Sequence, residues 1–285
     1  MRSLTEVPCP YCGAEERRPW AEENGYTAVR CAECSFVYVS PRPADVEISE
    51  AAKTGLHDVE QGQMAVIGQF HQSKVRMFEQ RLPELFERDM LRRPGLSWLD
   101  IGAGFGELLL ALRGLAADDA HIEGVEPCLP KVEKARSKGL RVDETPLEQL
   151  ERKYDVISLV NVFSHLPDPG AFLRELKRLL KPEGALFLVT GNAADIGAEE
   201  YPRPYYLPDH LVFAGERHVT GILEQADFDV IRMNRYRDFH PENKAFVVAK
   251  NVAKIALGRP HRPMKDLLFP NESGFRSLFV RAQSR

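Results

Sequence analysis

The sequence predicts an α/β protein with a doubly wound, mostly parallel sheet of seven strands, preceded by a small zinc ribbon and a helical lid. Three observations predict this architecture. Two C-x2-C pairs lie close to the N-terminus, a helical periodicity follows them, and beyond Pro94-Gly95 short apolar runs alternate with amphipathic helices. Such alternation is typical of a parallel sheet covered by helices on both faces.

The composition is that of an ordinary globular protein with room for about two domains. The chain has 285 residues, of which 44% are hydrophobic and 28% are charged. A formal net charge of −4 argues against a generally basic nucleic-acid binder. The first residues carry charges and no long apolar run follows, so we expect no secretion signal, no membrane span and a cytoplasmic location.

The four cysteines near the N-terminus predict a metal site. Cys9 and Cys12 form one pair and Cys31 and Cys34 the other, at a separation typical of a zinc ribbon. Each pair can lie on a tight turn that directs two thiolates at one ion. Four sulfur ligands complete a tetrahedron and leave no position for water, so the predicted Zn²⁺ is structural. Two disulfides are the alternative, and the fifth cysteine, Cys128, is expected to be a small buried residue.

Four segments are expected along the chain. The ribbon contains a hairpin at Asn24-Gly25 and an alternating strand from Phe36 to Val39. Apolar residues at spacings of three to five then predict lid helices. The last residues carry a local excess of arginine and lysine. The predicted boundaries are 1–44 for the ribbon, 45–95 for the helical lid, 96–250 for the sheet domain and 251–285 for a basic C-terminal extension.

Short apolar runs mark the candidate strands of the sheet. Ligands of such sheets bind beyond the carboxyl ends of the strands, so these ends are where a site is expected. The strands are predicted at Ser97 to Ile101, His121 to Glu126, Arg141 to Asp143, Asp155 to Val160, Ala185 to Thr190, Phe228 to Asn234 and Ala245 to Lys250. Helices are predicted to begin near Phe105, Leu129, Leu147, Pro169 and Gly215.

A glycine-rich segment follows the first predicted strand of this sheet. It has the form D-x-G-x-G-x-G, and Glu107 occupies the place of the third glycine of a dinucleotide motif. Bare backbone at these positions allows a ligand to approach closely. The shorter spacing suits a ligand without a pyrophosphate, such as S-adenosylmethionine. The predicted cofactor-binding residues of this loop are Asp100, Gly102, Ala103, Gly104 and Gly106.

An acidic residue closes the second predicted strand. Glu126 lies twenty residues after Gly106, where a carboxylate can accept hydrogen bonds from both ribose hydroxyls. Nicotinamide enzymes share this feature, so it does not discriminate between the two kinds of cofactor. Its register with the glycine loop favours the functional interpretation over a solvated acid at a strand end.

Together these motifs resemble the class I S-adenosylmethionine-dependent methyltransferases over about residues 96 to 250. The resemblance rests on the glycine loop, on Val125-Glu126-Pro127, on residues 154–158 with 161–169, and on Leu179-Leu180-Lys181-Pro182-Glu183-Gly184. It implies a Rossmann-like sheet with Glu126 and Pro127 near the ribose, Thr145 near the adenine and Asn161 along the methionine side. The ribbon resembles that of a subset that includes sugar C-methyltransferases and other biosynthetic members.

One position departs from the branch that methylates quinone precursors. An acidic residue usually precedes the histidine that matches His165, and some members hold a divalent metal there. Ser164 takes that position here. The resemblance therefore does not extend to a magnesium-dependent catechol-type mechanism.

Two histidines are the candidate catalytic groups. His165 follows the fourth predicted strand, and His210 precedes the helix that leads to the sixth. Histidine titrates near neutral pH and can accept a proton from a methyl acceptor. Loop packing with a hydrogen bond to the backbone is the alternative role of His165. Tyr201, Tyr205 and Tyr206 are expected either to line the acceptor site or to pack under a lid.

The predicted function is transfer of a methyl group to oxygen, nitrogen or carbon of a small molecule or sugar derivative. The cofactor carries the reactive carbon, so the protein mainly supplies alignment. Three alternatives remain open: an RNA methyltransferase that uses the ribbon and the basic tail, a nicotinamide-dependent oxidoreductase, and a non-catalytic interaction module. Nucleic acid and membranes are not expected as partners.

Overall fold

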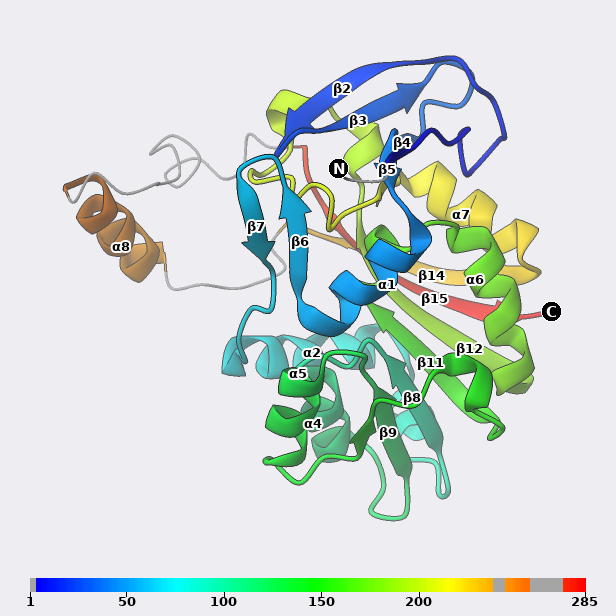
Figure 1. The fold of residues 1–285 in the computed structure, drawn as a ribbon. Helices are drawn as coiled ribbons and strands as arrows, with labels where there is room; N and C mark the ends of the chain where they lie inside the picture. Colours follow the sequence, from blue (N-terminus) through cyan, green and yellow to red (C-terminus); the bar gives the residue numbers. More distant parts are fainter. Residues whose placement is uncertain (1–3, 238–243, 257–273) are drawn as a thin grey trace.

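The computed structural model describes residues 4–237, 244–256 and 274–285 (Figure 1). A seven-stranded sheet runs through the molecule in the order β10-β9-β8-β11-β12-β15-β14. The first five strands in this order are parallel, and β15 is antiparallel to both of its neighbours. The strands are β8 (Ser97–Ile101), β9 (His121–Val125), β10 (Val142–Asp143), β11 (Tyr154–Val160), β12 (Leu180–Gly191), β14 (Phe228–Tyr236) and β15 (Ser277–Ser284). The predicted α/β class and mostly parallel sheet are confirmed.

The central strands are apolar on both faces, which is why they form the middle layer. In β12, Leu186 and Leu188 belong to the core on one face, whereas Phe187 and Val189 belong to the core on the other. Successive side chains of a strand point to opposite faces, so an unbroken apolar run must be covered on both sides. All four of these side chains are fully buried.

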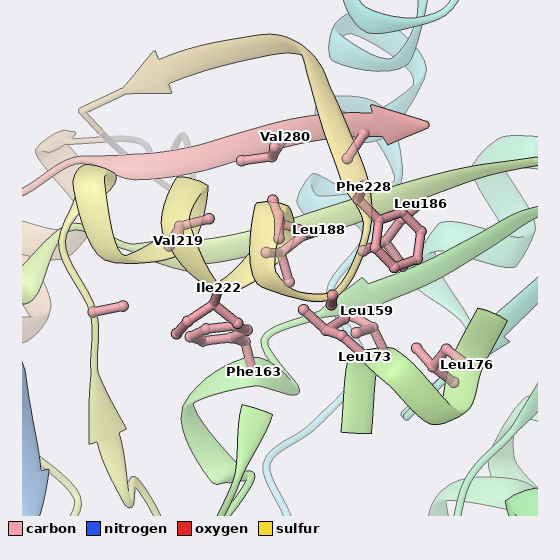
Figure 2. Packing of buried hydrophobic residues seen from close by; sticks show 14 of the residues in the cluster. Leu159, Phe163, Leu173, Leu176, Leu186, Leu188, Val219, Ile222, Phe228 and Val280 are labelled. Carbon is pink, nitrogen blue, oxygen red and sulfur yellow. The ribbon is translucent and has the colours of Figure 1, made fainter. Parts of the chain in front are cut away.

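Helices cover both faces of the sheet. Buried side chains of α2 (Gln72–Leu85), α3 (Arg88–Leu91) and α4 (Glu107–Leu115) belong to the core on the Phe187 face. Figure 2 shows the opposite core, where α6 (Pro169–Leu176) and α7 (Glu216–Gln225) meet the sheet. None of the described helices combines the length and apolar character needed to cross a membrane. The remaining helical elements of the sheet region are α5 (Leu129–Arg136), η1 (Leu147–Gln149), η2 (Phe163–His165), η3 (Lys177–Leu179), η4 (Ala193–Asp195) and η5 (Ala198–Glu200).

The ribbon strands form a second sheet that includes a segment from the other half of the chain. Its order is β13-β4-β3-β2, with β2 (Arg17–Glu23), β3 (Tyr26–Cys31), β4 (Val37–Val39) and β13 (Val212–Phe213). A short pair, β1 (Leu4–Thr5) with β5 (Arg42–Pro43), lies beside it. The hairpin expected at Asn24-Gly25 connects β2 to β3. Because β13 pairs with β4, backbone hydrogen bonds join the ribbon to the segment of chain between β12 and α7.

The segment between ribbon and sheet contains a hairpin that the helical pattern did not predict. Helix α1 (Asp45–Thr54) ends at Gly55, whose φ of 70° provides a left-handed cap. Strands β6 (Leu56–Val59) and β7 (Gly62–Ala65) then form a two-stranded sheet. The predicted helical periodicity is confirmed only in α1 and from Gln72 onward, because the turn at Gly62 was not recognised as a hairpin signal.

The last predicted strand is wrong. Residues predicted to form a strand from Ala245 to Lys250 lie in α8 (Lys244–Ala256), and the seventh strand is β15, near the C-terminus. A short apolar run fits a helix and a strand equally well, which explains the error. In the described part of the basic tail, Arg281 pairs with Glu87 and Arg285 with Asp229. The basic residues Arg259, Arg262 and Lys265 lie outside the described residues.

Phe279 tests the position of β15. Its ring is fully buried and contacts the rings of Phe78, Phe187 and Tyr236. We expect Phe279→Ala to lower the free energy of unfolding by about 3–5 kcal/mol, because it leaves a cavity inside the sheet core. Denaturant unfolding measures the loss, and Gln283→Ala at the partly exposed end of the same strand is the control. Equal stability of the two variants would contradict the placement of β15.

Candidate active site

The residues predicted to bind the cofactor gather at one edge of the sheet. They follow four strands that are neighbours in the order β10-β9-β8-β11, and all four strands are parallel. Their carboxyl ends therefore meet at the same edge. Asp100 lies in β8, the glycine loop 102–106 follows it, Glu126 and Pro127 follow β9, Thr145 follows β10 and Asn161 follows β11.

Asp100 is held in a buried hydrogen-bonded chain. The Ser158 hydroxyl donates to its carboxylate at 2.6 Å, and the Trp98 indole donates to the Ser158 oxygen at 2.9 Å. Burial raises the pKa of Asp100 to about 7, and the charges of Glu126 and Glu107 act in the same direction. A cationic group that entered beside Asp100 would find a carboxylate whose charge is otherwise poorly compensated.

Glu126 connects the end of β9 to the glycine loop. Its carboxylate accepts hydrogen bonds from the backbone N–H of Gly104 at 2.9 Å and of Cys128 at 3.1 Å, and Lys131 lies 3.8 Å away. These bonds leave further lone pairs on the two oxygens. A Cβ on Gly104 would meet no atom within 4 Å, so the space above the loop is open there.

Three other residues predicted to bind the cofactor are more exposed than Asp100 and Glu126. Pro127 and the Asn161 side chain are exposed, and Thr145 is half-buried. Asn161 has a φ of 56° and its N–H donates to Val189 O at 3.0 Å, so the chain turns sharply as it leaves β11. This turn leads directly into η2, which carries His165.

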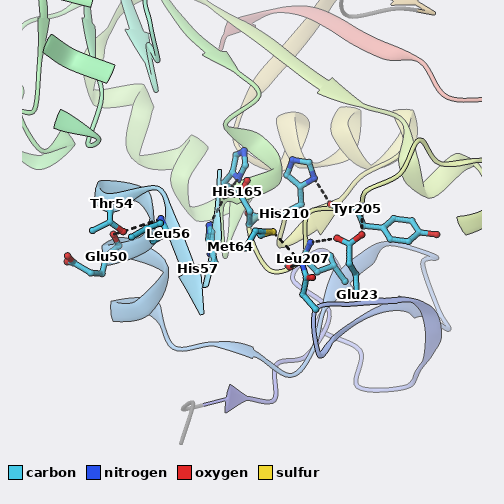
Figure 3. Close-up of polar contacts among 12 residues, drawn as sticks. Glu23, Glu50, Thr54, Leu56, His57, Met64, His165, Tyr205, Leu207 and His210 are labelled. Atoms are coloured by element: carbon cyan, nitrogen blue, oxygen red, sulfur yellow. Dashed lines mark hydrogen bonds and ion pairs between the residues drawn. The ribbon is translucent and has the colours of Figure 1, made fainter. Parts of the chain in front are cut away.

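His210 belongs to a tight loop, residues 205–211, which we call the histidine loop (Figure 3). Its ring Nδ1 lies 2.9 Å from Tyr205 O. A carbonyl only accepts, so Nδ1 carries the hydrogen and Nε2 has a free lone pair. Burial lowers the pKa of His210 to about 4, and the nearby His165 contributes to this effect. The ring is therefore neutral at neutral pH.

His165 faces the same point from η2. Its Nδ1 donates to Asp209 O at 2.8 Å and lies 3.2 Å from the Asp209 carboxylate. Although burial opposes a positive charge, this carboxylate raises the pKa of His165. The two histidine ring centroids are 5.0 Å apart. The backbone bond fits the packing role considered for His165, while the ring position keeps it beside His210.

Two members of the cluster were not predicted from the sequence. Asp209 accepts hydrogen bonds from His165 and from Nε2 of His57, the latter at 3.0 Å. Despite burial, the facing histidines hold the pKa of Asp209 well below its usual range. Asp209 could have been identified from the sequence because it precedes His210. His57 lies on the β6–β7 hairpin, which was not predicted, and no nearby residue in the sequence indicated a role for it.

The three tyrosines divide between the two expected roles. Tyr201 and Tyr205 stack with ring centroids 5.6 Å apart, and Trp20 of the ribbon contacts both edge-on. These two rings are packing residues in an aromatic cluster. Tyr206 differs, because it is 44% exposed and its ring lies edge-on against His210 at 5.8 Å.

The four ribbon cysteines converge on one point. The Sγ atoms of Cys9 and Cys34 are 3.5 Å apart, those of Cys12 and Cys31 are 3.6 Å apart, and all four lie within 4.8 Å of one another. All four are free thiols in the structure, and the Sγ–Sγ distances of 3.5 and 3.6 Å are longer than a disulfide bond. Zn–S bonds of about 2.3 Å in a tetrahedron separate the sulfurs by about 3.8 Å, so the donor set fits a zinc ion. Cys128 is fully buried elsewhere, as expected.

Comparison with known proteins identifies the family. A model described as a methyltransferase domain matches residues 69–233. The chain belongs to this methyltransferase family. A ubiquinone biosynthesis O-methyltransferase from Marinobacter nauticus is 30% identical over 172 residues, which cover 48% of this chain and 71% of that relative.

Solved structures share the fold. A putative sarcosine dimethylglycine methyltransferase from Galdieria sulphuraria matches with a TM-score of 0.56 and 16% identity, covering 76% of this chain and 92% of that one. A mycolic acid cyclopropane synthase complexed with SAH matches with a TM-score of 0.53 and 18% identity, covering 74% and 84%. The resemblance inferred from the motifs is thus confirmed. The protein is an S-adenosylmethionine-dependent methyltransferase, and the nicotinamide alternative is set aside.

Proposed function

We propose that this methyltransferase transfers a methyl group to a hydroxyl oxygen of a small molecule, with the histidine cluster at the acceptor. The relative from Marinobacter nauticus is named as a ubiquinone biosynthesis O-methyltransferase, which favours oxygen among the possible acceptor atoms. The observation that carries the proposal is the neutral His210, whose Nδ1–H is held by Tyr205 O so that the Nε2 lone pair is free, 5.0 Å between ring centroids from His165.

We infer that the cofactor binds at the carboxyl ends of β8 to β11. The buried Asp100 suits the ammonium of its methionine part, and the spare lone pairs of Glu126 suit the ribose hydroxyls. The open space above Gly104 allows close approach to the loop. Gly102, Ala103, Gly106, Pro127, Thr145 and Asn161 are proposed to line the same site.

The chemical step requires one proton acceptor. Bound S-adenosylmethionine would supply an electrophilic methyl group to the acceptor oxygen, and S-adenosylhomocysteine would leave with the electron pair of the carbon–sulfur bond. As the new carbon–oxygen bond forms, the hydroxyl becomes oxonium-like and strongly acidic. A base with a pKa of about 4 therefore suffices to take this proton at His210 Nε2. His165, with its raised pKa, is available to donate a hydrogen bond to the acceptor.

We propose that the ribbon cysteines hold a structural zinc ion. Four thiolates would leave no coordination position for a substrate, so the ion supplies no step of methyl transfer. Arg217 and His218 of α7 donate hydrogen bonds to Cys34 O, and the ring of His218 contacts Tyr11 and Phe36. Metal binding would therefore order the surface on which α7 packs.

Gly104→Val tests the cofactor site. The substitution places a branched side chain in the open space at a φ of 55°, and we expect binding of S-adenosylhomocysteine to weaken by more than about tenfold. Isothermal titration calorimetry measures the affinity. Gly95→Val is the matched control, because Gly95 also has a positive φ and no atom within 4 Å of its Cβ, but lies outside the site. Undiminished affinity in the Gly104 variant would place the cofactor elsewhere.

His210→Ala tests the proposed base. We expect kcat to fall by about 100- to 10,000-fold on an acceptor found in a screen of hydroxylated aromatics with labelled cofactor, while affinity for S-adenosylhomocysteine stays unchanged. A base works in its deprotonated form, above its pKa. With a pKa of about 4, His210 should cause no decline in wild-type kcat between pH 8 and about pH 5. Full turnover by the variant would remove His210 from the mechanism.

Cys31→Ser tests the metal site. Losing one of four thiolates should release zinc and destabilise the ribbon, because the ion crosslinks both cysteine turns. Mass spectrometry under native conditions gives the metal content, and thermal unfolding gives the stability. Cys128→Ser, which changes a buried cysteine away from the cluster, should retain the metal. Equal zinc content in both variants would show that the ribbon cysteines are not the ligands.

A further inference from the structure

Side chains at the β2–β3 turn of the ribbon form hydrogen bonds with the histidine loop. The Glu23 carboxylate accepts one hydrogen bond from Tyr205 N–H and another from Leu207 N–H, each at 3.0 Å. The side-chain amide of Asn24 donates to Leu207 O at 2.7 Å. Figure 3 shows Glu23 beside Tyr205 and Leu207. Two ribbon side chains thus satisfy three backbone groups of a loop that lies in the other half of the chain.

Tyr206, which lies between the two N–H groups bound by Glu23, has a strained backbone. Tyr206 has a φ of 61°, a left-handed conformation that is unfavourable for a residue with a Cβ. Such a residue persists only where its surroundings enforce it. Two N–H groups that converge on one carboxylate provide this constraint, since a relaxed Tyr206 would turn one of them away from Glu23.

The constrained conformation determines how His210 is held. The Tyr205 carbonyl accepts from His210 Nδ1 at 2.9 Å, and the Tyr206 carbonyl accepts from His210 N–H at 3.0 Å. Both carbonyls belong to the stretch that Glu23 fixes. The tautomer with a free Nε2 therefore depends on the backbone that the ribbon holds.

Residues at and next to the same turn also form hydrogen bonds with the β6–β7 hairpin, which carries His57. The Asn24 carbonyl accepts from Glu60 N–H at 3.1 Å, and the Tyr26 hydroxyl donates to Asp58 O at 2.9 Å. Asp58 lies in β6, the strand that carries His57, and Glu60 lies in the turn that follows this strand. The ribbon turn thus contacts both segments whose side chains meet at Asp209.

We propose that Glu23 is a positioning residue for methyl transfer: its carboxylate fixes the histidine loop so that His210 keeps Nδ1–H toward Tyr205 and presents Nε2 to the acceptor. This assignment rests on the proposed role of His210 as base. It gives the ribbon a part in the active site in addition to any stabilising role, and it makes Tyr206, exposed on the same loop, a ring that faces the acceptor.

The experiment compares Glu23→Ala and Glu23→Gln in the full-length, zinc-loaded protein with S-adenosylhomocysteine. Hydrogen–deuterium exchange of the peptide containing residues 205–211 reports on the loop, and ¹⁵N shifts of selectively labelled histidine report on the His210 tautomer. Glu22→Ala is the matched control, because Glu22 is the exposed neighbour on β2. His210→Gln assigns the resonance.

We expect Glu23→Ala to accelerate exchange in the loop by about tenfold or more and to shift His210 toward the Nε2–H tautomer. Glu23→Gln should lie between Ala and wild type, since its amide oxygen can accept only one of the two bonds while its NH₂ faces the other N–H. Zinc content and affinity for S-adenosylhomocysteine should remain within about twofold of wild type.

A wild-type exchange rate and tautomer in Glu23→Ala would overturn the proposal, as would the same changes in Glu22→Ala. If Glu23→Ala loses zinc or does not fold, Glu23→Gln decides, and an unchanged tautomer in that variant counts against the proposal. None of these signals depends on turnover. They therefore separate a failure of this inference from a failure of His210 as the base, which the His210→Ala kinetics would reveal.

Discussion

The pairing of β13 with β4 is the constraint on which the site depends. Leu211, just before β13, accepts a hydrogen bond from Val39 N–H of the ribbon at 2.8 Å and donates one to Ser164 O at 2.7 Å. A single residue thus bridges the ribbon and η2. Because His210 precedes it and His165 follows Ser164, both histidines are placed by this bridge. The ribbon shares a buried core with the sheet, and it would form a wall of the proposed acceptor site.

The parts of the fold that could be predicted are those encoded by neighbouring residues. The glycine loop and the strands from Ser97 to Val160 follow from local apolar runs and turn residues, and parallel connectivity then brings their ends together. Local patterns could not show that residues 244–256 form α8 and that β15 is the seventh strand of the sheet. In β15 the buried pair Phe279 and Val280 is followed by Arg281, whose guanidinium lies over the Phe86 ring and pairs with Glu87. In the sequence the strand therefore resembled part of a basic surface tail.

The candidate site also contains residues that the sequence could predict and residues that it could not. His165 and His210 could be identified because each follows or precedes an element of the predicted sheet. His57 and Glu23 could not, since their partners lie 152 and 182 residues away and depend on a hairpin and on the seating of the ribbon. Sequence patterns can locate candidate catalytic residues that lie next to predicted strands and helices. The residues that orient them are brought close by tertiary contacts, which such patterns do not reveal.

Burial lowers the pKa of both histidines, and the position of Asp209 explains why the net shift of His165 is nevertheless upward. With ring centroids 5.0 Å apart, the two rings disfavour being charged together. The carboxylate lies 3.2 Å from Nδ1 of His165, whereas Nδ1 of His210 faces a neutral carbonyl, so a proton is held more readily on His165 than on His210. In the proposed complex the sulfonium adds a further positive charge, which penalises protonation of His210 again. The base would thus be free of a proton when the methyl donor is bound, and it would take the proton that becomes acidic as the acceptor oxygen gains the methyl group.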